Sequence, residues 1–517
     1  MLRQRTDRHA GDRPVRRAEA PVSGPVNFAI VVPTIGRKTL QRLLAALEKS
    51  DGPTPEAVIV VDDRPEPDPP LLITANLPVT VLRSGGRGPA AARNVGWRSS
   101  TARWICFVDD DVRPHPGWLK ALAEDLKAAE AAGAVGSQAV IDVPVRPGRR
   151  STDDERRTQR LATAQWITAD MAYRRSALVE VGGFDERFPR AYREDSDLAL
   201  RITMAGNRII QGARRSRHPV ARATWLSSIR AQRGNRDDAL MHRKYGRGWR
   251  PAIGEGRGRL PAHLATTAAA MFAVAGRGRP AARWAALGWL ALTVEFAVRR
   301  FLAGPRTVTE AARMLITSIL IPPVAVYHRL RGEWDFRGAH RDPPLAVLLD
   351  RDDTIIEDGP YLNDPDGVRP VAGAVEALNK LRERGLMLAV VSNQSGIAKG
   401  LISTSQLADV NARVDALLGP FDSWQICVHD AGDNCSCRKP APGMVMAAAE
   451  ALGVQPSRCV LIGDTGGDVQ AALSAAADAV LVPTDRTLPQ EISDARARAR
   501  VASTLEDAVS LVLRDAR

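Results

Sequence analysis

The chain has 517 residues, too long for one ordinary hydrophobic core, and its 44% hydrophobic and 25% charged residues are typical of about two to four globular domains. Its formal net charge of +13 favours an anionic partner, such as a nucleotide sugar or an acidic membrane surface, unless it only reflects an overall arginine bias. Nucleic acid is excluded as that partner, because aromatic residues total only 5% and no basic run interleaves with them.

The first segment, residues 1–26, is rich in arginine and lacks an apolar core. It is typical of a disordered basic tail and not of a secretion signal. The whole chain has five cysteines, an odd number, and three of them cluster within a short stretch near the carboxy terminus. This distribution indicates a metal site in a reducing compartment rather than a disulfide scaffold. We therefore expect a cytoplasmic protein.

From residue 27 onward, short β-branched runs alternate with stretches of helical apolar spacing. The predicted strands are residues 28–32, 57–61, 79–82 and 104–108, and the predicted helices are residues 40–47 and 118–132. Alternation of this kind predicts a parallel α/β sheet.

Acidic residues stand at the ends of two of these predicted strands. Asp62 and Asp63 follow the second, and the run Asp109-Asp-Asp111 follows the fourth. Adjacent carboxylates repel each other unless a cation bridges them, so they suggest a divalent metal that carries a diphosphate. The alternative is an ordinary solvated acidic face. Three further motifs lie in the same part of the chain: residues 88–96 (GPAAARNVG), 182–186 (GGFDE) and 193–198 (REDSDL).

The order of these motifs resembles family 2 glycosyltransferases of the GT-A type, over about residues 27–225. The resemblance implies that Asp62 or Asp63 contacts the base or ribose of a nucleotide sugar. It also implies that Asp109 and Asp111 form a DxD pair on the diphosphate and on Mg²⁺ or Mn²⁺.

The same resemblance implies a base for the acceptor hydroxyl. Asp195, in preference to Glu194, would deprotonate that hydroxyl for an inverting displacement. His218 is a candidate further metal ligand, although a lone histidine more often satisfies a local hydrogen bond.

Residues 226–340 are expected to form a basic helical connector. The stretch from about residue 214 to 259, which overlaps its start, is strongly basic and poor in strands. Three apolar segments, residues 263–275, 282–298 and 314–327, fall short of the ~18 to 20 uninterrupted apolar residues of a bilayer-spanning helix. Glu295 interrupts the second, and Pro322-Pro323 is expected to break the third. Flanking arginines fit helices that lie on an anionic leaflet, at the inner face of the cell membrane. The alternative is a helical bundle packed on the first domain.

A second α/β pattern occupies residues 341–517. The predicted strands are residues 346–349, 387–391, 425–428, 459–462 and 479–482. The first ends in Asp350-Arg-Asp352, where alternation turns two carboxylates the same way so that they can share a cation. In a parallel sheet that end faces the ligand crevice. Further polar residues stand at or near the ends of later runs: Ser392, Asn393, Arg438, Lys439, Asp464 and Asp468.

This order of motifs resembles the haloacid dehalogenase superfamily of phosphotransferases. The resemblance implies that Asp350 attacks phosphorus to give an aspartyl-phosphate, while Asp352 protonates the leaving alcohol and then activates water. Ser392, Asn393 and Lys439 would hold the phosphoryl group.

Magnesium binding follows from the same resemblance. Asp464 would complete the Mg²⁺ site with the Asp350 carboxylate and the Asp352 backbone carbonyl, and Asp468 would support that site from behind.

The clustered cysteines add a second metal site. Cys427, His429, Cys435 and Cys437 provide three thiols and one imidazole, a tetrahedral zinc set with no open position, which is typical of a structural site. The alternative is a group of buried or redox-active cysteines.

Together with the zinc loop, residues 350–352, 393–400 and 437–444 resemble the heptose bisphosphate and histidinol-phosphate phosphatases, over about residues 345–485. The Pro-Gly-Met ending of the last motif is closer to D-glycero-D-manno-heptose 1,7-bisphosphate 7-phosphatases and implies that Arg438 contacts the distal phosphate. Asp353 departs from the glycine that is usual in the family.

The chain is therefore interpreted as α/β, with a GT-A type nucleotide-sugar-binding domain, a helical connector and a Rossmann-like haloacid dehalogenase domain. We expect a bifunctional sugar enzyme that acts on sugar phosphates and nucleotide sugars. Two alternatives stay open. In the first, the glycosyltransferase half is an inactive binding or docking module. In the second, the phosphatase acts on histidinol phosphate.

Overall fold

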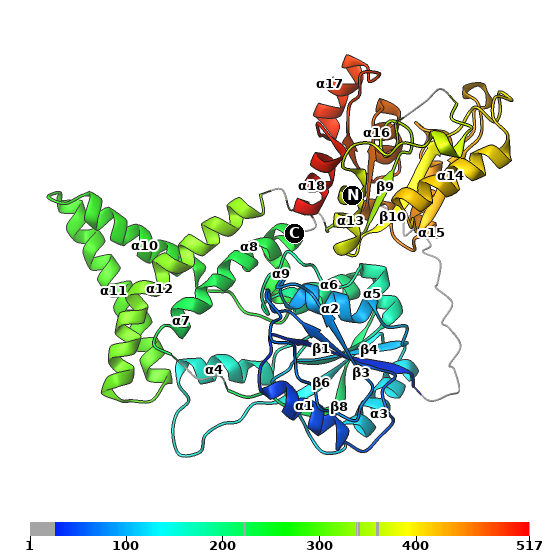
Figure 1. The fold of residues 1–517 in the computed structure, drawn as a ribbon. Helices are drawn as coiled ribbons and strands as arrows, with labels where there is room; N and C mark the ends of the chain where they lie inside the picture. The colour runs from blue at the N-terminus through cyan, green and yellow to red at the C-terminus, as the bar shows by residue number, and fades with distance from the viewer. Residues whose placement is uncertain (1–25, 221–223, 338, 340–341, 358–360, 516–517) are drawn as a thin grey trace, which may run out of the picture.

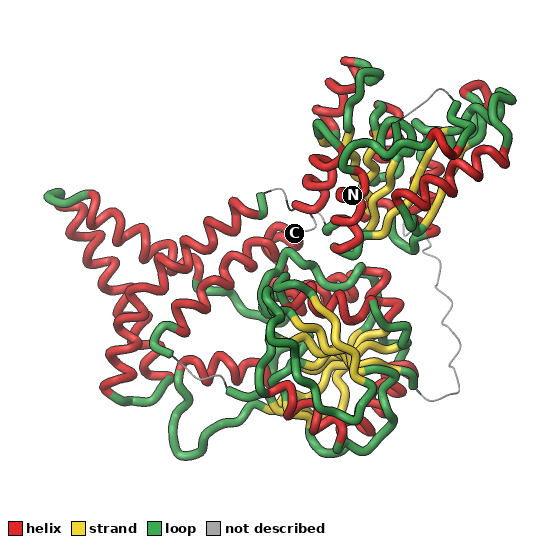
Figure 2. Tube along the Cα trace, in the orientation of Figure 1, coloured by secondary structure: helices red, strands yellow, loops and turns green. Residues whose placement is uncertain are grey.

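The computed structural model describes residues 26–220, 224–337, 339, 342–357 and 361–515, and it contains two α/β domains and a group of long helices (Figures 1 and 2). The α/β class and the three-part architecture agree with the sequence-based prediction. The basic tail predicted at residues 1–26 lies outside the described residues, apart from Val26.

The amino-terminal domain is built on an eight-stranded mixed sheet in the order β3-β2-β1-β4-β7-β6-β8-β5. The strands are β1 (Phe28–Thr34), β2 (Val58–Asp62), β3 (Val79–Arg83), β4 (Trp104–Val108), β5 (Arg113–Pro114), β6 (Gly136–Asp142), β7 (Asp170–Arg174) and β8 (Ile209–Arg217). Strands β1 to β4 are the four predicted ones, and they pair in parallel. The predicted strands are thus parallel as expected, while the sheet as a whole is mixed, because β7 runs antiparallel to both β4 and β6.

Helices cover both faces of this sheet and carry several of the motifs. They are α1 (Thr39–Glu48), α2 (Pro89–Arg98), α3 (Trp118–Ala131), α4 (Asp153–Gln159), α5 (Arg175–Val181) and α6 (Glu194–Met204), with the 3₁₀ turn η1 (Arg160–Ala162) after α4. The stretch expected to be poor in strands, from about residue 214 to 259, begins with the last four residues of β8, and its other described elements are helical. Arg214 is fully buried there and pairs with Asp125 at 2.9 Å and with Asp170 at 2.8 Å.

The connector is helical, as expected. Its elements are α7 (Ser227–Arg230), η2 (Ala231–Arg233), α8 (Gly234–Tyr245), η3 (Gly246–Gly248), α9 (Trp249–Ala252), α10 (Leu260–Ala275), α11 (Pro280–Ala303) and α12 (Val308–Asp335). Its first part packs on the amino-terminal domain, where Leu240 and Trp249 share a core cluster with Phe188 and Leu200.

The expected break at Pro322-Pro323 is absent, since α12 continues through both prolines. Neighbouring Ile321 and Ala325 are buried, and this packing offsets the loss of the backbone hydrogen bonds that proline cannot make. The apolar segments are therefore longer than predicted. With 24 and 28 residues, α11 and α12 are long and apolar enough to cross a membrane, a test that buried core helices also pass.

The carboxy-terminal domain contains a six-stranded parallel sheet in the order β11-β10-β9-β12-β13-β14. Its strands are β9 (Ala346–Leu349), β10 (Met387–Asn393), β11 (Ser423–Cys427), β12 (Cys459–Gly463), β13 (Asp478–Leu481) and β14 (Arg500–Val501). Its helices are α13 (Ala374–Glu383), α14 (Thr404–Leu418), α15 (Gly443–Ala451), α16 (Gly466–Ser474), α17 (Pro489–Arg498) and α18 (Leu505–Asp515), with short 3₁₀ turns η4 (Pro365–Gly367), η5 (Ala431–Asp433) and η6 (Pro456–Arg458). All five predicted strands are present.

The two domains contact each other at the turn that follows α5. Gly182 has a φ of +77°, and a Cβ atom placed there would lie 2.1 Å from the side chain of Leu345, just before β9. Beside it, the Arg458 guanidinium donates to the carbonyl of Val181 at 3.4 Å. The phosphatase-like domain therefore packs directly against the turn that carries the GGFDE motif.

Candidate active sites

The first candidate site lies at the carboxyl edge of the six-stranded sheet. Strands β10, β9 and β12 are neighbours, so the residues that follow them meet at one edge. Asp350 follows β9, Asp464 follows β12, and Asp468 lies in the first turn of α16. The three carboxylates offer oxygen atoms that all lie within 4.8 Å of one another. Such a set of oxygen donors suits a hard divalent cation.

Lys439 adds one positive charge to this group. Its Nζ atom lies 2.8 Å from Asp350 and 2.6 Å from Asp468, and it donates to the carbonyl of Val391 at 2.9 Å. The Asn393 side chain holds the Lys439 backbone, because its amide donates to the Lys439 carbonyl and its oxygen accepts from the Lys439 N–H, both at 3.1 Å. Asn393 thereby fixes where the lysine enters the site.

One lysine does not balance three buried carboxylates. Burial raises the pKa of Asp350 to about 8, with Asp468 and Asp352 adding to the rise and Lys439 opposing it. Burial likewise raises the pKa of Asp464 to about 7. The donor set thus carries more negative charge than its surroundings neutralise, and a bound divalent cation would remove that excess.

Asp352 is held beside this group by residues to which the sequence analysis gave no role. Its carboxylate accepts from the Arg351 guanidinium at 2.9 Å and from the Gln394 amide at 2.6 Å. The same Gln394 nitrogen lies 2.9 Å from the Ser392 hydroxyl. Gln394 therefore links Asp352 to Ser392.

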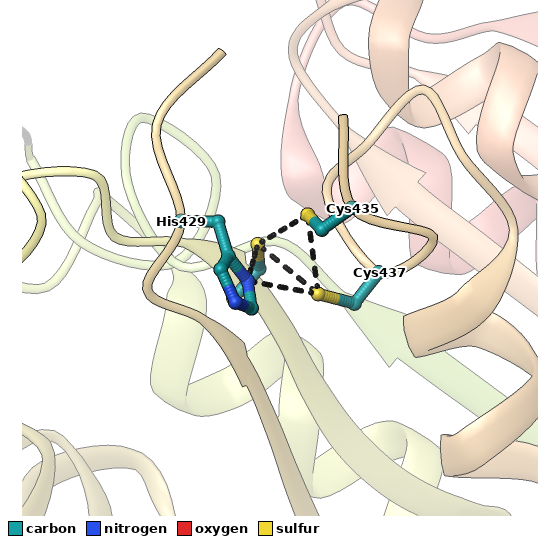
Figure 3. Close-up of side chains that lie close together, drawn as sticks. His429, Cys435 and Cys437 are labelled. Carbon is teal, nitrogen blue, oxygen red and sulfur yellow. Dashed lines mark hydrogen bonds between the residues drawn. The ribbon is translucent and has the colours of Figure 1, made fainter. Parts of the chain in front are cut away.

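The predicted cysteine and histidine residues form a compact cluster at the end of β11 and in the loop that follows it (Figure 3). The Cys437 sulfur lies 3.4 Å from the sulfurs of Cys427 and Cys435 and 3.3 Å from His429 Nδ1, and the Cys427 sulfur lies 3.7 Å from that of Cys435. Ligands at ~2.0 to 2.3 Å from a tetrahedral zinc ion stand roughly 3.5 to 3.8 Å apart. The cluster fits a four-coordinate metal.

Arg438 lies against this cluster. Its backbone N–H donates to the Cys435 sulfur at 3.4 Å, and its guanidinium donates to the His429 carbonyl at 3.2 Å. The next residue is Lys439, so the cysteine cluster and the carboxylate group share one short piece of chain.

The second candidate site lies at the end of β4 in the amino-terminal domain. Asp109 is partly exposed and pairs with Arg93 at 2.8 Å, while Asp111 pairs with Arg37 at 3.1 Å. Between them, Asp110 is buried and accepts from the Thr34 hydroxyl at 2.6 Å. The middle acid therefore holds β4 to β1, which leaves its two neighbours at the surface of the site.

Arg93 is the residue of this second site that sequence reasoning missed, although the motif that contains it was noted. It is fully buried and joins two motifs, because its guanidinium lies 2.8 Å from Asp109 and 2.9 Å from Glu194. Burial raises the pKa of Glu194 to about 8; the nearby Asp195 adds to this, and Arg93 opposes it.

Asp195 is only half buried, and its carboxylate accepts from the Ser196 N–H at 2.7 Å. Burial raises its pKa. His218 Nε2 lies 3.8 Å from Asp111, and its Nδ1 lies 2.8 Å from the Pro219 carbonyl. His218 thus adjoins the DxD pair and also has the local hydrogen-bond partner that a lone histidine usually finds.

The remaining predicted pair, Asp62 and Asp63, lies at the end of β2. Arg64 binds Asp62 at 2.7 Å and, against the effect of burial, lowers its pKa. Asp63 accepts from the Gly88 N–H at 3.0 Å and from the Ser84 hydroxyl at 2.7 Å. Asp63 therefore fixes the loop that leads into α2.

Comparison with known proteins finds a family match in each of the two α/β domains. The family model for glycosyl transferase family 2 matches residues 29–186, and a HAD-hydrolase-like model matches residues 436–508. The D-glycero-beta-D-manno-heptose-1,7-bisphosphate 7-phosphatase of Pseudomonas putida is 36% identical over 156 residues, which cover 29% of this chain and 89% of that protein. The enzyme of the same name from Escherichia coli K12 is 33% identical over 162 residues, which cover 29% of this chain and 85% of that protein.

Two solved structures are each similar to part of the chain. A D,D-heptose 1,7-bisphosphate phosphatase from B. bronchiseptica, complexed with magnesium and phosphate, has 27% identity and covers 33% of this chain and 99% of its own, with a TM-score of 0.31. A mannosyltransferase from Pyrobaculum calidifontis, in complex with GDP-Man and Mn²⁺, has 19% identity and covers 60% of this chain and 88% of its own, with a TM-score of 0.35.

Both halves of the chain therefore match enzyme families. It belongs to the haloacid dehalogenase-type phosphatases through its carboxy-terminal domain and carries a family 2 glycosyltransferase domain at residues 29–186.

Proposed function

We propose that the carboxy-terminal domain hydrolyses D-glycero-D-manno-heptose 1,7-bisphosphate and removes the 7-phosphate. The observation that carries this proposal is the group of Asp350, Asp464, Asp468 and Lys439 at one sheet edge, in a chain whose relatives bear that enzyme's name. Bound to these carboxylates, Mg²⁺ would supply positive charge that lets an anionic phosphate approach an anionic nucleophile.

The chain's own residues divide the reaction into two steps. A carboxylate oxygen of Asp350 forms a bond to phosphorus while the bond to the sugar oxygen breaks, and Asp352 gives that oxygen its proton. Asp352 then takes a proton from water, whose oxygen attacks phosphorus and releases Asp350 and inorganic phosphate. Lys439 and Ser392 hold the phosphoryl oxygens, and Arg438 contacts the second phosphate of the substrate.

Phosphate release from a panel of sugar bisphosphates and from histidinol phosphate, with Mg²⁺, tests this proposal. We expect the heptose bisphosphate to be preferred and Asp350→Asn to reduce its turnover by at least about a thousandfold. Asp366→Asn, a change at an exposed 3₁₀ residue, is the matched control and should keep full turnover. Preference for histidinol phosphate, or full activity of Asp350→Asn, would overturn the proposal.

We further propose that the amino-terminal domain transfers a sugar from a nucleotide donor with inversion of configuration. Asp109 and Asp111 would hold Mg²⁺ or Mn²⁺ with the diphosphate, and Asp62 and Asp63 would lie beside the nucleoside. Asp195 is favoured as the base because it is partly exposed, whereas Glu194 is buried against Arg93.

Hydrolysis of nucleotide sugars by Asp109→Asn and Asp111→Asn variants separates an active transferase from an inactive docking module. We expect the wild type to hydrolyse a donor slowly without acceptor, and each variant to lose at least about a hundredfold of that rate. Equal rates in wild type and variants would favour the docking module.

Two further assignments complete the proposal. The cluster of Cys427, His429, Cys435 and Cys437 would hold a structural Zn²⁺, as its donor set and spacing suggest. The chain would be divided into a glycosyltransferase unit at residues 27–225, a connector at 226–340 and a phosphatase unit at 341–517.

The connector would lie on the inner face of the cell membrane and make this a peripheral cytoplasmic enzyme. Large apolar side chains are exposed on α10 and α11, among them Phe272, Trp284 and Leu287. Between residues 256 and 309 the chain has eight arginines and one acid, Glu295, which suits anionic lipid. Flotation with vesicles that contain about a third anionic lipid tests this, and Trp284→Asp with Leu287→Asp should abolish binding. Equal flotation of wild type and double variant would contradict it.

A further inference from the structure

A pocket of about 670 Å³ opens between β6, β8 and the segment that follows η1 in the amino-terminal domain. Its size falls in the range of small-molecule sites, ~300 to 1,000 Å³. Neither the DxD acids nor Asp195 belongs to its lining. The proposed phosphatase and donor-binding chemistry do not use it.

Two pieces of the pocket lining lead directly to the proposed donor site. Strand β6 forms one wall and ends at Asp142. The Asp142 carbonyl accepts from the backbone N–H of His218, and the ring of His218 lies beside Asp111. The segment at residues 162–166 forms the opposite wall, and three residues later the Ala169 carbonyl accepts from the Asp109 N–H at 3.2 Å. Both walls thus end beside the acids that would hold the diphosphate.

Trp166 connects the pocket to the proposed base. Its side chain lines the pocket and packs against the two core clusters that contain Leu198 and Leu200 of α6, the helix that carries Asp195. Its φ of +62° is rare for a bulky residue. Strain of this kind tends to occur at binding and active sites.

The pocket has hydrogen-bonding groups but no charge. None of the residues that line it, all of them within the described parts of the chain, is ionisable. Gln138 binds the Trp166 N–H and the Ala164 carbonyl and so holds the wall in place. The side chain of Gln165 makes no hydrogen bond within the described structure, and Gln211 uses only its NH₂ group, on the Gln138 carbonyl at 3.1 Å.

We propose that this pocket binds the acceptor of the glycosyltransferase domain, and that the acceptor is an uncharged sugar. The assignment rests on the proposed transferase function. Amide groups that both donate and accept match sugar hydroxyls, and Trp166 offers an aromatic face to a sugar ring. The lining offers no cation to pair with the charge of a phosphorylated or carboxylated acceptor.

Transfer kinetics with paired acceptors test this proposal. The acceptors are neutral disaccharide glycosides and the same glycosides with a 6-phosphate or a uronic acid, with UDP- and GDP-hexoses as donors. We expect transfer to the neutral glycosides. We also expect Gln165→Leu and Gln211→Leu each to raise the acceptor KM about three- to tenfold, as for one lost hydrogen bond, while the donor KM stays within about twofold.

A matched glutamine outside the pocket provides the control. Gln490→Leu, at an exposed position of α17, should change neither KM. A preference for the charged acceptors, or unchanged acceptor KM in both pocket variants, would overturn the acceptor assignment while leaving the transferase proposal intact. Absence of both donor hydrolysis and transfer in the wild type would instead overturn the transferase proposal, and the acceptor assignment with it.

Discussion

The ammonium nitrogen of Lys244 lies 3.0 Å from a carboxylate oxygen of Asp342, the described residue that leads from the connector toward β9. The same nitrogen lies 2.7 Å from Asp185 of the GGFDE motif and 2.5 Å from Asp197 of α6. Although burial opposes it, Lys244, together with Arg201 and Arg458, lowers the pKa of Asp342 to about 2. One buried lysine thus ties the interdomain segment to two motifs of the glycosyltransferase domain.

Replacement of this lysine should therefore destabilise the glycosyltransferase domain. In Lys244→Met the buried carboxylates of Asp185 and Asp197 lose a shared cation, and we expect the free energy of unfolding to fall by about 3 to 5 kcal/mol. Denaturant unfolding measures this change. The control is Arg243→Met on the same helix, because the Arg243 pair with Glu333 is partly exposed and should cost at most about 1 kcal/mol. Equal loss in both variants would contradict the prediction.

Asp353 should tolerate glycine better than a β-branched residue. Its φ is +54°, a conformation that costs an L-residue about 1 to 2 kcal/mol and costs glycine almost nothing. Glycine also lowers the free energy of unfolding by about 0.5 to 1 kcal/mol, because it makes the unfolded chain more flexible. Asp353→Gly should therefore change the unfolding free energy by no more than about 1 kcal/mol, whereas Asp353→Val should lower it clearly. Thermal unfolding of both variants checks this, and a more stable Asp353→Val would refute it.

The cysteine cluster should support the phosphatase domain through its metal. Cys437→Ser removes one of four ligands, and we expect bound zinc, measured by elemental analysis, to fall from about one ion per chain. Because metal binding contributes to folding, the phosphatase unfolding transition should also move to lower temperature. Ser436→Ala, at an exposed position between the ligands, is the control and should retain zinc. Loss of zinc without any thermal shift would argue against a structural metal.

Acidification should loosen the packing of α10 on α11. His263 is buried against Phe296, with ring centroids 5.1 Å apart, and burial together with Arg259 and Arg300 lowers its pKa to about 4. A folded pKa below the ordinary 6.5 means that the fold favours the neutral ring. The neutral His263 ring therefore stabilises the fold fully above pH 6.5, and this stabilisation is lost as the pH falls toward 4.

A His263→Phe variant measures that contribution, because phenylalanine keeps the ring and cannot titrate. Between pH 7.5 and pH 5 the melting temperature of the wild type should fall further than that of His263→Phe. Parallel falls in the two proteins would show that His263 does not contribute.

The sequence predicted the elements and site residues that depend on local pattern. Asp350, Ser392 and Asp464 directly follow or end apolar runs, and parallel pairing of those runs is enough to bring them together. Strand β8 was missed because its polar and basic residues look like a solvated segment, whereas Arg214 is neutralised by acids from α3 and β7. No local pattern shows such pairing.

Arg93 and Gln394 were missed for a related reason. Both lie in motifs that were noted, but their roles depend on partners that are distant in the chain. Arg93 meets Glu194 across 101 residues, and Gln394 meets Asp352 across 42. At Pro322-Pro323 the local rule was misleading. Proline usually ends a helix, but tertiary packing of α12 keeps this helix intact through both prolines.

The contact between Gly182 and Leu345 limits how the two enzymes in this chain can diverge. Any side chain at position 182 would collide with the neighbouring domain as well as strain its own turn. A substitution at Gly182 would therefore also disturb the packing of the carboxy-terminal domain, and a larger side chain at position 345 would disturb the turn after α5. Substitutions at this contact should therefore affect the stability of both domains together.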